Sequence, residues 1–97
     1  MEKEYFVVFD LRNKAKKVDK GWKRLYTYGT ENETCIVEFK PIPTEEELEY
    51  YKKLSKLWKH IFVLEKDKLI KKVALLKEGY EKVGFKFTTY NENIWRR

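Results

Sequence analysis

The segment Arg12–Arg24 carries the residues best suited to contact another molecule. Seven of its residues are basic and one, Asp19, is acidic, so the segment has a formal charge of +6, equal to the net charge of the whole chain. Lysine and arginine neutralise phosphates and release counterions, and an aromatic ring among them can stack on an unpaired base. The sequence therefore predicts a nucleic-acid contact through Arg12, Lys14, Lys16, Lys17, Lys20, Trp22, Lys23 and Arg24.

The same segment has a second interpretation that needs no ligand, because lysine-rich loops also keep a protein soluble. Basic residues clustered without compensating acids favour the first interpretation, since paired charges are the commoner pattern on ordinary surfaces. Asp19-Lys20-Gly21 has turn composition. We therefore expect a basic loop or hairpin arm at residues 12–24.

The triplet Glu38-Phe39-Lys40 is the one catalytic pattern in the chain. It ends an expected strand that is followed by a turn and a helix, and over about residues 19–65 it resembles the core of the PD-(D/E)xK nuclease superfamily. The resemblance implies that Asp19, or alternatively Asp10, holds Mg²⁺ together with Glu38, while Lys40 helps to activate water. Carboxylates suit Mg²⁺, and an adjacent cation stabilises developing negative charge. The alternative is a surface pair on the solvated face of a sheet, with no cofactor.

The remaining reactive side chains are predicted to be structural. His60 is the single histidine and has no Cys or Asp at ligand spacing, so no metal site is expected there. Cys35 alternates with Val37 and Phe39, which indicates a thiol in the core. The four glycines are scattered and form no phosphate-binding loop.

Helical periodicity is confined to Thr44–Gly84. Thr44 follows two prolines and precedes three glutamates, a pattern that predicts a helix N-terminus at this residue. Asp67 is the expected N-cap of a second helix, which Gly79 or Gly84 would end. Ile61–Leu64 between them fits either a helix end or a short strand.

Four other segments have the composition of strands. They are Tyr5–Phe9, Trp22–Tyr28 with Trp22, Tyr26 and Tyr28 on one side, Cys35–Lys40, and Phe85–Tyr90. We predict a single α+β domain over residues 1–97. It would contain a small, mostly antiparallel sheet in the order βββα(β)αβ, with two helices packed on one face.

Composition narrows the class of protein. The 97 residues contain one cysteine and no apolar run near the roughly 20 residues of a membrane span. We therefore expect a cytoplasmic protein in a reducing compartment, without a membrane partner. The chain is rich in Lys and Glu and contains no Gln. This composition resembles that of small proteins from hyperthermophilic archaea and their viruses, in which case the compartment would be the host cytoplasm.

Apolar residues of the first expected helix suggest a further partner. The first helix is apolar on more than one side, through Tyr50, Tyr51, Leu57 and Trp58. Such a helix is either deeply buried or an oligomer contact, and in so small a core we favour a homodimer contact. For Trp95, near the end of the chain, a packing lid and a frayed terminus remain open. The leading hypothesis is a small basic nucleic-acid-binding protein. The alternatives are a non-enzymatic interaction or structural module and a metal-dependent nuclease.

Overall fold

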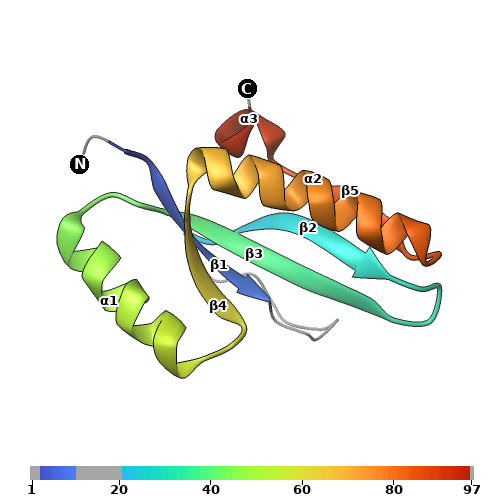
Figure 1. The fold of residues 1–97 in the computed structure, drawn as a ribbon, viewed down its shortest axis with the longest axis horizontal. Coiled ribbons are helices and arrows are strands. Elements are labelled where there is room, and N and C mark those ends of the chain that lie inside the picture. The colour runs from blue at the N-terminus through green and yellow to red at the C-terminus, as the bar shows by residue number, and fades with distance from the viewer. Residues whose placement is uncertain (1–2, 11–20, 97) are drawn as a thin grey trace.

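The computed structural model describes residues 3–10 and 21–96, so residues 11–20 of the chain lie outside the description (Figure 1). Eight elements follow one another along these residues. They are β1 (Tyr5–Asp10), β2 (Lys23–Gly29), β3 (Thr34–Ile42), α1 (Glu45–Leu57), β4 (Ile61–Glu65), α2 (Lys66–Lys82), β5 (Lys86–Thr89) and α3 (Glu92–Trp95).

The five strands form one sheet in the order β4-β1-β3-β2-β5, with every neighbouring pair antiparallel. The predicted α+β class, antiparallel sheet and element order are therefore confirmed. Strand β1 is interior, as its run of apolar residues predicted: Phe6, Val7 and Val8 are all buried. The ambiguous Ile61–Leu64 lies within strand β4, which pairs with β1 along its length.

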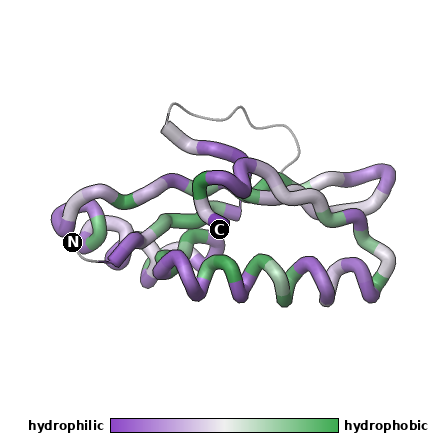
Figure 2. The backbone as a smooth tube through the Cα atoms, turned by 90° about the horizontal axis from the view of Figure 1, so that it is seen from above, coloured by the Kyte–Doolittle hydropathy of each residue, from purple (hydrophilic) through white to green (hydrophobic). Residues whose placement is uncertain are grey.

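The first helix begins where the sequence predicted. The backbone N–H of Glu47 donates to the Thr44 hydroxyl at 3.2 Å, so Thr44 is the N-cap. Helix α2 begins at Lys66, one residue before the predicted cap Asp67, because β4 leads directly into it through Glu65. Its end is followed by Gly84 at φ 90°, a backbone angle that favours glycine. Figure 2 shows hydrophobic and hydrophilic turns alternating along α2, as expected for an amphipathic helix.

The two long helices pack on opposite faces of the sheet, which corrects the prediction that both lie on one face. Phe6 and Val8 of β1 belong to the same buried cluster as Leu69 of α2. Val7, between them in sequence, belongs to a second cluster with Leu48 of α1. Successive strand residues point to opposite faces, so α1 and α2 cover different faces; in Figure 1 they lie below and above the strands. We call these faces the α1 side and the α2 side.

Connection topology explains this arrangement. Helix α1 joins the parallel strands β3 and β4, and α2 joins the parallel strands β4 and β5. The first connection crosses the sheet toward the β4 edge, whereas the second crosses back toward the β5 edge. Crossovers between parallel strands are nearly always right-handed. Two such crossovers that run in opposite directions must therefore place their helices on opposite faces.

The C-terminal turn is packed into the molecule. Trp95 in α3 is 1% exposed and belongs to the α2-side cluster. Its indole N–H donates to the carbonyl of Tyr90 at 2.8 Å. Trp95 is therefore the packing lid that was one of the two predicted alternatives. Among residues 3–10 and 21–96, no helix has the length and apolar character to cross a bilayer.

Candidate nucleic-acid interface

A β-bulge in β2 decides which side chains reach the α1 side. Arg24 pairs with Glu38 and Tyr26 pairs with Val37, so Leu25 is an extra residue on β2. Leu25 and Tyr26 both belong to the α2-side cluster. The alternation of side chains therefore changes phase at the bulge, and Arg24 lies on the α1 side, the face opposite Tyr26.

The bulge also corrects the prediction that Trp22, Tyr26 and Tyr28 share one side. Tyr26 and Tyr28 pack on the α2 side, whereas Trp22 packs with the α1-side cluster. The half-buried Trp22 ring makes edge-to-face contacts with Phe9 at 6.1 Å and Tyr51 at 6.3 Å between ring centroids. Its place immediately before β2 is fixed by one aromatic residue from β1 and one from α1.

Arg24 stacks on an aromatic ring from the far end of the chain. Its guanidinium carbon lies 5.2 Å from the ring centroid of Tyr90, which directly follows β5. This is a cation–π contact, which orients the flat guanidinium over the ring. The Nε atom of Arg24 is buried and has no hydrogen-bond partner among the residues that the structure describes.

The backbone around this pair is held by three hydrogen bonds. The side-chain amide of Asn91 donates to the Arg24 carbonyl at 2.9 Å. The N–H of Tyr90 donates to the Leu25 carbonyl at 3.0 Å, and the Tyr90 carbonyl accepts from Trp95. Asn91 has φ 55°, a left-handed conformation that asparagine tolerates better than most residues. Arg24 and Tyr90 are therefore held in place before any ligand arrives.

The two strands next to the Arg24–Tyr90 pair, β2 and β5, carry no acidic residue. Strands β2 and β5 contain no Asp or Glu, and they contribute Lys23, Arg24 and Lys86. Within the described ranges, the ion pairs of the structure involve none of these three cations. Glu38 of β3, the cross-strand partner of Arg24, is the buried acid beside this surface and is 5% exposed.

The structure places three of the eight predicted contact residues. Trp22 and Arg24 lie on the α1 side, and Lys23 is exposed on the opposite face, in register with Phe39. The other five predicted residues lie outside the described part of the chain: Arg12, Lys14, Lys16, Lys17 and Lys20.

Sequence reasoning missed Lys86, Thr88, Tyr90 and Asn91. Alternation along the last strand does put Lys86, Thr88 and Tyr90 on a common face. It does not reveal that β5 pairs with β2, because that pairing joins residues about sixty positions apart. The sequence therefore shows which residues of β5 share a face, but it does not show that β2 is the strand beside them.

The residues of the nuclease resemblance are only partly brought together. Glu38 and Lys40 share the α1 side, where Lys40 Nζ donates to the Tyr51 hydroxyl at 3.4 Å. Asp10 points to the α2 side, where its Oδ2 accepts from the Tyr28 hydroxyl at 3.0 Å. Asp19 lies outside the described residues.

Across residues 3–10 and 21–96, no three His, Cys, Asp or Glu side chains are grouped as metal ligands would be. The alternative interpretation of a solvated pair also needs correction, because Glu38 is buried.

The α2 side holds its own cluster of polar aromatic residues. Burial raises the pKa of the Tyr28 hydroxyl above its ordinary value, and the neighbouring Asp10 carboxylate adds to that effect. Burial followed by Asp10 also raises the pKa of Tyr26. Both phenols therefore stay protonated at neutral pH, and Tyr28 serves as a hydrogen-bond donor within the core.

The predicted dimer contact on α1 is only partly exposed. Tyr50 is 58% exposed, Leu57 is 77% exposed and Trp58 is 52% exposed. Tyr51 turns inward instead and contacts the Trp22 ring. The single histidine, His60, packs its ring against Phe9 at 5.1 Å and Trp58 at 5.6 Å, which agrees with a structural role.

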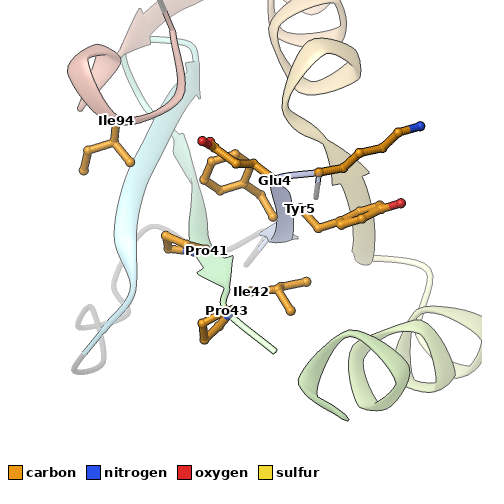
Figure 3. Close-up of a pocket in the computed structure, with 8 residues that line it drawn as sticks. Glu4, Tyr5, Pro41, Ile42, Pro43 and Ile94 are labelled. Atoms are coloured by element: carbon orange, nitrogen blue, oxygen red, sulfur yellow. The ribbon is translucent and has the colours of Figure 1, made fainter. Parts of the chain in front are cut away.

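A groove of about 310 Å³ opens where β1 begins and β3 ends (Figure 3). The residues that line it include Tyr5, Ile42 and Ile94 as well as the charged Lys3 and Glu4. Lys3 pairs with Glu65 at 3.5 Å, and Glu4 pairs with Lys66 at 3.3 Å. The charged groups of this groove are therefore already paired within the protein.

Comparisons with known proteins do not connect this arrangement to a family. No protein-family model, no curated protein and no solved structure matches the chain.

Proposed function

We propose that this chain binds nucleic acid through the α1 side of β2 and through the basic segment that leads into it. The observation that carries the proposal is that Trp22 and Arg24 share the α1 side, while the bulge at Leu25 turns Tyr26 and Tyr28 to the other face. A cation stacked on an aromatic ring, beside a second aromatic ring, is suited to a phosphate backbone and its bases. The residues that precede it in sequence are strongly basic.

Charge distribution supports this function over the interaction module. Strands β2 and β5 carry no acid, whereas α1 begins with three glutamates. Arg24 and Lys86 therefore lie on the α1 side of two strands without acids, and the +6 segment that leads into β2 adds to this charge along the sequence. A polyanion is the partner that such a concentration attracts most strongly.

The test measures the salt dependence of binding to fluorescently labelled DNA and RNA by anisotropy. One variant changes Lys14, Lys16, Lys17 and Lys20 to Gln. A matched control changes Lys68, Lys71, Lys77 and Lys82, exposed residues of α2, and removes the same charge from another part of the molecule. Each phosphate contact contributes about 0.7 to 0.9 to the slope of log K against log salt. We therefore expect the slope of the first variant to fall by up to about 3.6, and the slope of the control to stay near that of wild type.

Two results would count against the proposal. Equal losses in the two variants would mean that net charge alone attracts the nucleic acid and that no particular surface binds it. Absence of binding by the wild-type protein at low salt would overturn the proposal, and a salt-resistant complex with an acidic protein would then favour the interaction module.

A further inference from the structure

The α1 side of the sheet is only half covered by its helix. Helix α1 packs against β4 and β3, at one end of the molecule. Strands β2 and β5 extend away from it, as Figure 1 shows. Thr88 and Lys86, on the α1 side of β5, are exposed, and Thr27 beside them is half-buried. Neither α1 nor α2 covers this part of the sheet.

These residues form a continuous polar and aromatic row. The Arg24–Tyr90 pair lies at one end, Thr27 and Thr88 face each other in the middle, and Lys86 lies at the other end. Tyr90 and Lys86 are four residues apart, so the row spans about 13 Å. We call it the β2–β5 row.

The chemistry of the β2–β5 row matches a single strand better than a duplex. A guanidinium stacked on a ring offers a flat surface to an unpaired base, whereas the faces of paired bases are hidden inside a duplex. Threonine hydroxyls can donate to phosphate or sugar oxygens. A sheet face is also too broad for the major groove, which admits a helix or a two-stranded ribbon.

We propose that a single-stranded nucleic acid lies along the β2–β5 row, with one unpaired base stacked on the Arg24–Tyr90 pair. This inference rests on the proposed function and specifies its ligand. Lys86 contacts a phosphate at the other end of the row, and Thr27 and Thr88 contact the backbone between them. The hydrogen bonds from Asn91 and Trp95 hold the backbones of Arg24 and Tyr90, which keeps the two side chains next to each other when no ligand is bound.

The test compares a labelled 12-nucleotide single strand with the same sequence in a duplex, at one fixed salt concentration. Arg24→Lys keeps the charge and removes the flat guanidinium, and Tyr90→Leu removes the ring. Each is expected to weaken single-strand binding about tenfold, the size of one lost stacking contact, and to change duplex binding less than about twofold. Tyr90→Phe keeps the ring and is expected to bind like wild type.

Matched controls make the same chemical changes elsewhere. Arg96→Lys and Tyr50→Leu alter an exposed arginine and an exposed tyrosine outside the β2–β5 row, and both are expected to leave single-strand binding unchanged. Circular dichroism melting confirms that each variant is folded. If Tyr90→Leu unfolds, Arg24→Lys and Tyr90→Phe still test the stacking contact.

The outcomes separate this inference from the proposed function. Wild-type preference for the single strand, lost in Arg24→Lys and Tyr90→Leu, supports both. Equal binding of single strand and duplex, or equal losses on both ligands, overturns the β2–β5 row as a stacking surface and leaves the proposed function standing. Absence of binding to either ligand overturns both.

Discussion

The two faces of this sheet are built differently. The α2 side holds a continuous core in which Leu25, Phe39, Leu69 and Trp95 are each at most 1% exposed. The α1 side has a smaller cluster around Val7, Ile42 and Leu48, and farther along that face, on β5, Lys86 and Thr88 are exposed. The α2 side therefore buries more apolar side chains than the α1 side, and we expect it to contribute more to the stability.

The difference follows from helix length and position. Helix α2 has 17 residues and contacts β1, β4 and β5, so it crosses the sheet from one edge to the other. Helix α1 has 13 residues and stays near β4 and the end of β3. Stacked aromatic rings extend the α2-side core further, with Tyr26 and Phe87 centroids 4.6 Å apart. Burying large rings contributes much of the apolar area in a small domain.

Adjacent residues of β5 provide the sharpest test of this comparison. Phe87 points into the α2 side and is 6% exposed, while Thr88 points to the α1 side and is exposed. Phe87→Ala is expected to lower the free energy of unfolding by about 3–5 kcal/mol. Thr88→Ala is expected to change it by less than about 0.5 kcal/mol. Urea denaturation measures both, and similar losses would mean that the two faces are equally buried.

A second pair of variants compares the helices. Leu48 of α1 is 7% exposed and has half-buried neighbours such as Tyr51, which can relax into the space that a smaller side chain leaves. Leu48→Ala is therefore expected to cost about 2 kcal/mol, near the lower end for buried leucine. Leu69→Ala, on α2, is expected to cost more, about 3–4 kcal/mol. The comparison fails if α1 turns out to be the more sensitive helix in urea denaturation.

The α2 side also predicts a pH dependence. Burial and Asp10 raise the pKa of Tyr26 above its ordinary value of 10.0, so the folded protein keeps a proton that the unfolded chain releases. The contribution of Tyr26 to the free energy of unfolding is fully present below pH 10 and falls as the pH rises further. Between pH 10 and 11, wild type is expected to lose up to about 1 kcal/mol more than Tyr26→Phe. Urea denaturation at each pH measures these losses. Equal losses in wild type and Tyr26→Phe would contradict the assignment of this pH dependence to Tyr26.

The smallest effect on stability is expected at the exposed end of α1. Leu57 is 77% exposed, so Leu57→Glu should change the free energy of unfolding by less than about 0.5 kcal/mol. If Tyr50, Leu57 and Trp58 form a homodimer contact, the same substitution places a charge in it and shifts the protein to the monomer. Sedimentation velocity at several concentrations measures this shift. A wild-type protein that is monomeric at every concentration would remove the dimer hypothesis.

The sequence predicted the features that local rules determine. The Thr44 cap, the strands and the order of the elements depend on short-range patterns that a single chain displays directly. The bulge at Leu25 could not be predicted, because Trp22–Tyr28 alternates plausibly without it. The side of each helix depends on the strand order, which long-range pairing decides.

The candidate site shows the same limit. Trp22 and Arg24 were predicted from their basic surroundings, and both lie on one face. Tyr90 could not be predicted as a site residue from the sequence. Its contact with Arg24 depends on the pairing of β5 with β2 and on the hydrogen bond from Asn91 to the Arg24 carbonyl. Contacts between residues distant in sequence carry no local signature.

The position of β1 in the sheet has a consequence for biosynthesis. It is the first strand in the chain, yet its two neighbours are β3 and β4, and β4 ends at Glu65. At about 5–20 residues per second, Glu65 is synthesised roughly 3 to 11 s after Asp10. The β2–β3 hairpin can form on the ribosome during this interval. The second edge of β1 stays unpaired until β4 is made, and Phe6 and Val8 then wait for α2, so β1 of the nascent chain is an apolar strand exposed to aggregation during this interval.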